Sequence, residues 1–246
     1  MYLPEVQSQG VQYPSADGTS INAYFSRPAD TPGPRGGVIV IMEAFGLNDH
    51  IEDIARRFAH NGYLAIAPDM YTREGSPDAS NIQSVMQVMF SVPDTQAMAD
   101  LDGVAAYLRS QADCNGKVGA IGFCSGGRYT LMFGCKGANV NACVDSAGGF
   151  IIQDEHTAQR PVSPIDMVPD LQCPLLALFG EEDPNPSPAH AEKLKAALDK
   201  YNKTYEFVMY RNAGHAFFAD YRPSYRAAPA QDMWHRTLQF YGQYLN

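Results

Sequence analysis

The sequence predicts an α/β fold in which a mostly parallel central sheet is flanked by helices on both faces, with an antiparallel hairpin at the N-terminus. The first observation is a continuous β-branched apolar run at residues 38–42, as a strand buried on both faces requires. The second is that such runs alternate with segments of helical apolar spacing up to the end of the chain. The third is the turn signal Asp17-Gly18 between apolar residues 11–13 and 21–25.

The individual elements follow in chain order from this alternation. The hairpin occupies residues 11–27, and the first central strand occupies 38–42. A helix at 49–61, closed by Gly62, and a strand at 63–67 complete the first βαβ unit. The later expected elements are a helix at 94–110, a strand at 117–121, a helix at 125–134, strands at 142–144 and 175–179, a helix at 189–201, a strand at 205–210 and a helix at 228–244. Residues 153–170 are polar and hold three prolines, which predicts a surface excursion that rims a site.

Composition narrows the class of protein. A chain of 246 residues that is 45% hydrophobic, with no repeat and no long linker, predicts one domain over residues 1–246. A net charge of −9 opposes contact with phosphate backbones, so we expect no nucleic-acid partner. No apolar run approaches the roughly 18 residues that a membrane helix needs, and the N-terminus has no signal-peptide pattern. We therefore expect a cytoplasmic monomer or small homo-oligomer with no membrane partner.

The cysteines argue against a disulfide framework and against a bound metal. Their number, five, is odd, and none of them has the C-x-x-C spacing of a zinc site. We expect free thiols, no metal and no cofactor.

One of these cysteines lies in a motif typical of nucleophilic catalysis. Gly122-Phe123-Cys124-Ser125-Gly126-Gly127 directly follows the strand at 117–121 and opens a helix, in the pattern G-x-nucleophile-x-G. Small flanking residues are needed because the nucleophile occupies a sharp, strained turn. The helix N-terminus favours the thiolate form of Cys124. The alternative is a glycine-rich turn that only packs closely or cradles a phosphate, although G-x-G-x-x-G is not matched and no Walker lysine follows.

Candidate partners for Cys124 follow in the order acid, then histidine. Asp183 lies in an acidic loop after the strand at 175–179, and His215 follows the strand at 205–210. Glu181 and Glu182 are rival acids in the same loop. Because ligands of such folds bind at the carboxyl ends of the strands, we expect Cys124, one of these three acids and His215 to form a catalytic triad.

A fourth candidate element is the loop Glu43-Ala44-Phe45-Gly46 after the first central strand. Folds of this kind supply one oxyanion-hole N–H from that loop and another from the residue after the nucleophile, which predicts the backbone N–H groups of Ala44 and Ser125. A carboxylate at Glu43 is unexpected after a buried strand, and it is either paired and structural or disfavours the thiolate of Cys124.

Aromatic residues in these loops are candidates for an apolar pocket wall that binds substrate, with a role in the core as the alternative. They are Phe45, Phe123, Phe150, Phe217 and Phe218.

Taken together, these motifs resemble those of the dienelactone hydrolase family. The likeness also includes Gly62-Tyr63-Leu64-Ala65-Ile66-Ala67-Pro68-Asp69 and Gly214-His215-Ala216-Phe217-Phe218, and it covers nearly the whole chain. It implies the α/β-hydrolase fold, a Cys-His-Asp triad with Asp183 as the acid, and hydrolysis of a lactone ester bond, typically in an enol-lactone carboxylate. It further implies that Glu43 pairs with the resting thiol and is displaced when substrate binds.

The chain departs from the family pattern at the arginines that hold a substrate carboxylate. Residues 81–90 contain no Arg or Lys, and Ala219 stands four residues beyond His215, where the family has an arginine. Arg128, Arg222 and Arg226 are the candidate replacements, each with a surface or packing role as the alternative.

Three functions remain open at this point. The first is a hydrolase of lactones or small carboxylic esters. The second is a thioesterase or general carboxylesterase acting on a different acyl substrate, and the third is a non-catalytic ligand-binding member of the fold.

Overall fold

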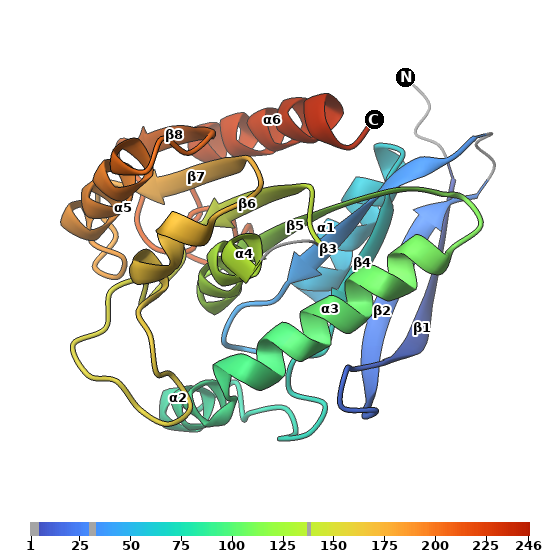
Figure 1. Ribbon diagram of the computed structural model, residues 1–246, viewed down its shortest axis with the longest axis horizontal. Helices are drawn as coiled ribbons and strands as arrows, with labels where there is room; N and C mark the ends of the chain where they lie inside the picture. The colour runs from blue at the N-terminus through green and yellow to red at the C-terminus, as the bar shows by residue number, and fades with distance from the viewer. Residues whose placement is uncertain (1–4, 30–32, 137–138) are drawn as a thin grey trace.

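The computed structural model describes residues 5–29, 33–136 and 139–246, and its eight strands form one sheet in the order β1-β2-β4-β3-β5-β6-β7-β8 (Figure 1). The β1–β2 and β2–β4 pairs are antiparallel, and every other pair is parallel. The strands are β1 (Val6–Pro14), β2 (Ser20–Pro28), β3 (Arg35–Ile41), β4 (Leu64–Pro68), β5 (Cys114–Phe123), β6 (Ala142–Ser146), β7 (Leu175–Gly180) and β8 (Tyr205–Tyr210). The predicted N-terminal hairpin and mostly parallel sheet are confirmed.

Helices cover both faces of this sheet. On one face α1 packs on β2, β3 and β4, and it meets α6 through Phe58 and Trp234, whose ring centroids lie 4.7 Å apart. On the other face α3 and α4 pack together over β5. The helices are α1 (Asp49–His60), α2 (Ile82–Ser91), α3 (Asp94–Ser110), α4 (Ser125–Lys136), α5 (Pro188–Lys200) and α6 (Ala227–Tyr244), with a 3₁₀ helix η1 (Pro164–Asp170).

The central strands are built from residues that tolerate complete burial. In β3, residues Val38, Ile39, Val40 and Ile41 are all 0% exposed, as expected of a strand covered on both faces. β3 and β5 pair with Ile41 opposite Gly122, so their carboxyl ends lie side by side. This register brings the loop after β3 next to the turn after β5.

Two elements differ from the sequence expectations. The helix α2 is not anticipated, because it buries only Val85 and Met89 and therefore lacks a broad apolar stripe. It is capped by Asn81, whose side chain accepts a hydrogen bond from Gln83 N at 3.0 Å. The excursion at 153–170 is also not wholly irregular, because η1 begins at Pro164, a residue well suited to the first turn of a helix.

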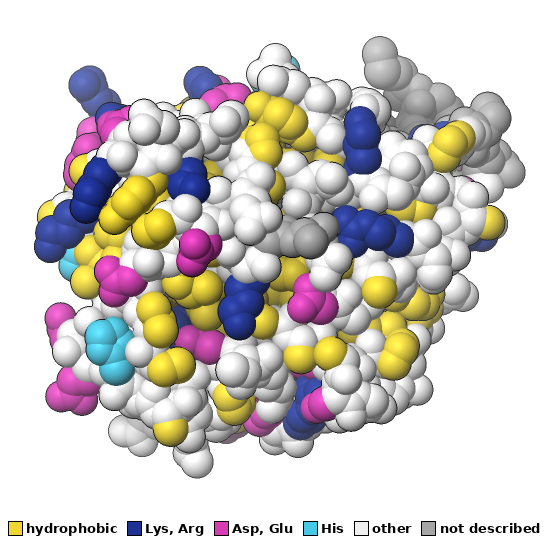
Figure 2. Space-filling view, in the orientation of Figure 1, with side chains coloured by type: hydrophobic (Ala, Val, Ile, Leu, Met, Phe, Trp, Pro, Cys, Tyr) yellow, Lys and Arg dark blue, Asp and Glu magenta, His cyan; other side chains and the backbone are white. Residues whose placement is uncertain are grey.

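The surface carries charges of both signs. On the face seen in Figure 2, lysine and arginine side chains lie scattered among acidic ones and do not gather into one basic patch. Within the described residues, none of the helices combines the length and the apolar character needed to cross a bilayer.

Candidate active site

Cys124 occupies a sharp turn between β5 and α4. β5 ends at Phe123 and α4 begins at Ser125, and Cys124 has φ of 55°, a left-handed conformation that is strained for a residue with a side chain. Its backbone is held by two hydrogen bonds, one to the last residue of β6 and one from the loop that follows it. Cys124 N donates to Ser146 O at 3.1 Å, and Gly149 N donates to Cys124 O at 3.1 Å.

The glycines on either side of Cys124 are required by close backbone contacts. A Cβ atom at Gly122 would lie 2.0 Å from Gly126 O, and one at Gly126 would lie 2.3 Å from Ile41 O. Both distances are far below van der Waals contact, so any side chain would push β3, β5 and α4 apart. The turn at Cys124 can therefore form only with glycine two residues before and two residues after the cysteine.

His215 connects Cys124 with Asp183. His215 Nδ1 lies 2.8 Å from Asp183 Oδ2, and because a carboxylate only accepts, the Nδ1–H donates in this bond. Burial disfavours the charged imidazole, but the hydrogen bond to Asp183 and the interaction with the neighbouring Cys124 thiol outweigh it and raise the pKa of His215 to about 10.

Asp183 itself is a fixed acceptor. It is 2% exposed, and its Oδ1 accepts a hydrogen bond from Asn185 N at 2.8 Å. Glu181 and Glu182 are exposed, and Glu181 lies 3.9 Å from Arg211 on the surface. Of the three acids that the sequence leaves open, the structure joins Asp183 to His215.

The loop after β3 contributes a buried carboxylate. Glu43 is 3% exposed, and its Oε2 accepts a hydrogen bond from Arg222 Nη2 at 2.9 Å. Burial raises the pKa of Glu43, while the charges of Arg222 and His215 and a bond to Tyr221 oppose the rise. The resemblance implies that Glu43 pairs with the resting thiol, whereas the structure pairs Glu43 with Arg222 and the thiol with His215.

The two expected oxyanion donors lie on neighbouring strand ends. Ala44 is three residues past Ile41 in β3, and Ser125 is three residues past Gly122 in β5, the residue paired with Ile41. Ala44 O accepts a hydrogen bond from Tyr71 Oη at 3.1 Å, which anchors the loop.

A narrow cavity of about 10 Å³ lies at Cys124, enough for about one water molecule. Phe123 and Phe218 stack across it with ring centroids 5.4 Å apart. A substrate therefore enters only when side chains around the cavity move. It is lined by Glu43, His50, Phe123, Cys124, Ser146, Ala147, Ala216, Phe217, Phe218 and Ala219.

The candidate pocket-wall residues divide between this cavity and its surroundings. Phe123, Phe217 and Phe218 line it, whereas Phe45 packs its ring 4.6 Å from the guanidinium of Arg222. Phe150 lies farther along, in edge contact with Phe90 at 5.3 Å.

The candidate arginines have different surroundings. Arg128 is 0% exposed, donates to Asp94 at 2.6 and 2.9 Å and to Gln153 at 3.0 Å, and does not line the cavity. The expected contact of Arg128 with substrate disagrees with the structure, because Arg128 extends from α4 toward Asp94 at the start of α3. Arg226 is exposed and donates to the carbonyls of Pro223 and Tyr225. Arg222 is the arginine that bonds a residue of the cavity.

Sequence reasoning missed two residues near the cavity. His50, which the sequence motifs do not single out, lines the cavity of Cys124. Tyr71 bonds the loop that carries Ala44. Both follow the carboxyl end of a parallel strand, β3 or β4, and that placement is the signal by which they could have been found.

The described residues include no cluster of three or more His, Cys, Asp or Glu side chains that could hold a metal ion. All five cysteines are free thiols, and Cys135, Cys143 and Cys173 are buried.

A mostly parallel sheet with a nucleophile-type turn after a central strand defines an α/β-hydrolase fold. Comparisons with known proteins agree: a model of the dienelactone hydrolase family matches residues 21–245. The chain belongs to the dienelactone hydrolase family, and it is a hydrolase acting on a lactone or ester.

Relatives and solved structures support this membership. The chain is 40% identical to a "Putative carboxymethylenebutenolidase" of Methylorubrum extorquens over 95% of this chain and 80% of that protein. It is 33% identical to a "Probable 2-oxo-3-(5-oxofuran-2-ylidene)propanoate lactonase" of a Bradyrhizobium species, over 90% of this chain and 89% of that one. The crystal structure of a "Putative Dienelactone Hydrolase" from Klebsiella pneumoniae superposes with a TM-score of 0.92 at 37% identity, covering 98% of this chain and 100% of that one.

Proposed function

We propose that the protein hydrolyses lactones or small carboxylic esters by acyl transfer to Cys124. The observation that carries this proposal is the hydrogen bond between Asp183 and His215, together with the interaction of His215 with the Cys124 thiol, which is presented on a strained turn. A nucleophile, a base and a group that orients the base are the components that this chemistry needs. The names of the relatives, a carboxymethylenebutenolidase and a lactonase, support a lactone as substrate.

In the first half of the reaction, the thiol proton lies on His215, whose raised pKa favours the protonated imidazole, and Cys124 Sγ attacks the carbonyl carbon. The developing oxyanion is stabilised by the backbone N–H groups of Ala44 and Ser125. The carbon–oxygen bond of the ester then breaks, and His215 returns the proton to the leaving alcohol, which remains attached to the acyl group when the substrate is a lactone.

In the second half, water cleaves the thioester that joins the acyl group to Cys124. His215 takes a proton from the attacking water, the carbon–sulfur bond breaks, and the proton returns to the thiol. Asp183 holds the imidazole in the orientation and tautomer that both halves require.

Glu43 and Arg222 adjust the site to a substrate that carries a carboxylate. Such a substrate competes with Glu43 for the guanidinium of Arg222 and frees the Glu43 side chain inside the cavity. Arg222, and not Arg128, is thus the substrate-binding arginine in this proposal, with Phe45, Phe123 and Phe217 as apolar contacts.

The test is hydrolysis of 4-nitrophenyl acetate, dihydrocoumarin and the dienelactone isomers by the native protein and by Cys124→Ala. We expect Cys124→Ala to lose about 10⁴-fold or more in kcat, as other nucleophile deletions do. Cys114→Ala is the matched control, because Cys114 is also a partly exposed free thiol, at the opposite end of β5, and its removal leaves activity intact.

Three outcomes would overturn the proposal. Full activity of Cys124→Ala would exclude this nucleophile. Absence of turnover of any ester or lactone by the unmodified native protein, although its Cys124 reacts with iodoacetamide, would favour a non-catalytic binding protein. Turnover confined to acyl thioesters would favour a thioesterase.

A further inference from the structure

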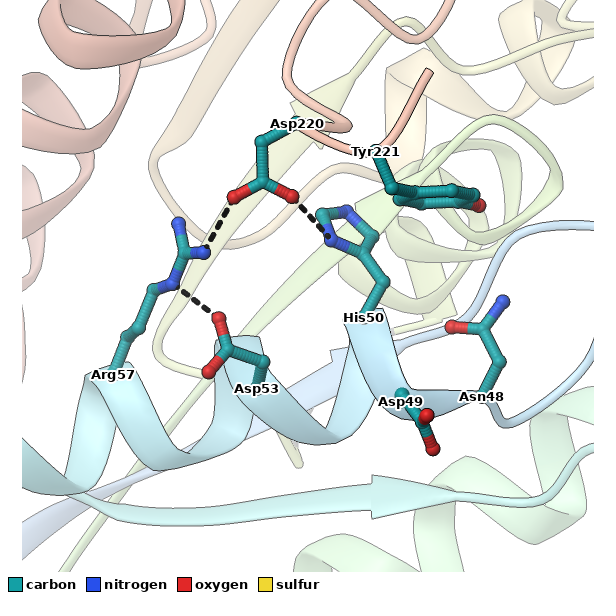
Figure 3. A pocket seen from close by; sticks show the side chains of 7 residues that line it. All are labelled: Asn48, Asp49, His50, Asp53, Arg57, Asp220 and Tyr221. Carbon is teal, nitrogen blue, oxygen red and sulfur yellow. Dashed lines mark hydrogen bonds and ion pairs between the residues drawn. The ribbon is translucent and has the colours of Figure 1, made fainter.

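A second and much larger cavity lies beside the active site. It has a volume of about 600 Å³ and opens between the first turns of α1 and the segment after Ala219 (Figure 3). We call it the α1 groove. Its lining residues are Asn48, Asp49, His50, Asp53, Arg57, Asp220 and Tyr221.

His50 forms the wall between the α1 groove and the cavity of Cys124, because it lines both. Its side chain is 7% exposed, and its ring packs against Tyr221 at 5.1 Å and Phe218 at 6.2 Å. Burial lowers the pKa of His50, against the raising effect of Asp220, so the wall is a neutral imidazole at neutral pH. A small displacement of His50 would join the two spaces.

The chain runs directly from the catalytic histidine to the α1 groove. Residues 216–219 line the Cys124 cavity immediately after His215, and Asp220 and Tyr221 line the groove next. In the proposed reaction His215 gives its proton to the leaving alcohol, so that alcohol lies beside His215, from which the chain leads to the groove. The α1 groove therefore extends the leaving-alcohol side of the site.

The lining of the groove has the chemistry of a site for hydroxyl groups. Six of its seven side chains are planar and polar, and each presents neighbouring donor or acceptor atoms that suit adjacent hydroxyls. The remaining residue, Tyr221, is 55% exposed; the guanidinium of Arg222 lies over its ring at 5.1 Å and donates to its Oη, which leaves the other side of the ring for a ligand. Aliphatic side chains are missing from this lining, so its apolar surface comes from the ring of Tyr221 and from the carbon atoms of polar side chains.

The arrangement is partly preorganised. Arg57 Nη2 donates to Asp220 Oδ2 at 2.9 Å and Arg57 Nε donates to Asp53 Oδ2 at 2.5 Å, which fixes three of the polar groups (Figure 3). Three carboxylates, those of Asp49, Asp53 and Asp220, outnumber the one arginine in the lining. The groove therefore disfavours a phosphorylated or carboxylated ligand and suits a neutral one.

We infer that the α1 groove binds the alcohol part of the substrate, and that this alcohol is an uncharged polyol such as a sugar. The inference rests on the proposed ester hydrolase function and specifies the substrate on its leaving-group side. Tyr221 provides a face for the sugar ring, and the planar polar side chains bond its hydroxyls.

The activity test compares two acetate esters with the same acyl group. One is 6-O-acetyl-D-glucose, and the other is cyclohexylmethyl acetate, which keeps a six-membered ring on a primary alcohol but lacks the hydroxyls. We expect kcat/KM to favour the sugar ester by at least about tenfold, because a site built for hydroxyls rejects an analogue without them. Tyr221→Ala should bring this ratio close to one, whereas Tyr221→Phe, which keeps the ring, should retain the preference.

A distant variant serves as the control. Asp232→Asn removes a surface carboxylate that pairs with Arg236 at 2.6 Å on α6, and it should leave the ratio unchanged. A binding measurement is added that does not depend on turnover: saturation-transfer NMR of methyl β-D-glucoside with the Cys124→Ala protein. We expect saturation transfer to the glucoside, and we expect it to be lost when Tyr221→Ala is added.

The outcomes separate this inference from the proposed function. Hydrolysis of 4-nitrophenyl acetate without a sugar preference and without saturation transfer would overturn the groove inference and leave the hydrolase standing. Tyr221-dependent saturation transfer in a protein that cleaves no ester would support the groove as a sugar site and overturn the proposed reaction. A preference for acetylcholine over 3,3-dimethylbutyl acetate without a sugar preference would show a cation site and overturn the inference.

Discussion

Replacing Asp183 by asparagine tests the hydrogen-bonded chain without changing its shape. In the native site Asp183 Oδ1 accepts from Asn185 N at 2.8 Å and Oδ2 faces His215 Nδ1 at 2.8 Å. The backbone N–H of Asn185 requires an acceptor, so the asparagine oxygen takes the Oδ1 position and its NH₂ group faces His215. Nδ1 must then accept, and the imidazole proton moves to Nε2, the nitrogen needed as a base.

The expected loss is large. Trapping a catalytic histidine in the wrong tautomer costs about 10⁴-fold in kcat in a serine protease, and we expect a loss of that order for Asp183→Asn. It corresponds to about 5 kcal/mol of transition-state stabilisation. Loss of the negative charge also lowers the pKa of His215 from its native value of about 10.

Steady-state hydrolysis of 4-nitrophenyl acetate measures kcat, and circular dichroism verifies that the variant is folded. Glu181→Gln and Glu182→Gln are matched controls from the same loop, and both should retain native kcat because these side chains are exposed. A folded Asp183→Asn protein that loses less than about tenfold, or an equal loss in either control, would refute the reasoning about which acid orients His215.

Three further outcomes are expected. Folding raises the pKa of His215 from 6.5 to about 10. The stability that this shift contributes is therefore fully present below about pH 6.5 and is lost as the pH rises through 10. The urea midpoint of the native protein should fall toward that of His215→Gln over this pH range. Asp94→Ala leaves the fully buried Arg128 without its carboxylate and should cost about 3–5 kcal/mol in the free energy of unfolding, measured with urea, and adding Arg128→Met should restore most of it. Glu43→Gln removes a negative charge beside the thiol and should speed alkylation of Cys124 by iodoacetamide at neutral pH, whereas an unchanged or slower rate would contradict its modulating role.

The parts of the site that the sequence predicts are those encoded in short stretches of chain. The turn at Cys124 depends on glycines within two residues of it, and Asp183 and His215 each follow their own strand directly. Strand runs such as 38–42 are equally local, because burial on both faces demands apolar residues at every position. Both the nucleophile motif and the fold class can therefore be predicted from the sequence.

The contacts that the sequence could not supply depend on which surfaces meet in space. The direction of Arg128 is set by the packing of α4 against α3, and its partner Asp94 lies 34 residues away. The bond between Glu43 and Arg222 spans 179 residues, so neither side chain alone identifies the other. His50 becomes a site residue only because the segment after His215 folds over the start of α1.

The two hydrogen bonds that fasten Cys124 to the end of β6 and the loop after it also make the strained turn observable. A left-handed cysteine is held in place by Ser146 O and Gly149 N, so the turn can relax only when both bonds open. Hydrogen–deuterium exchange at the amides of Cys124 and Gly149 should therefore report one common free energy of opening, once each rate is corrected for the intrinsic exchange of that amide. That free energy would measure how often the preorganised turn is lost in the native protein.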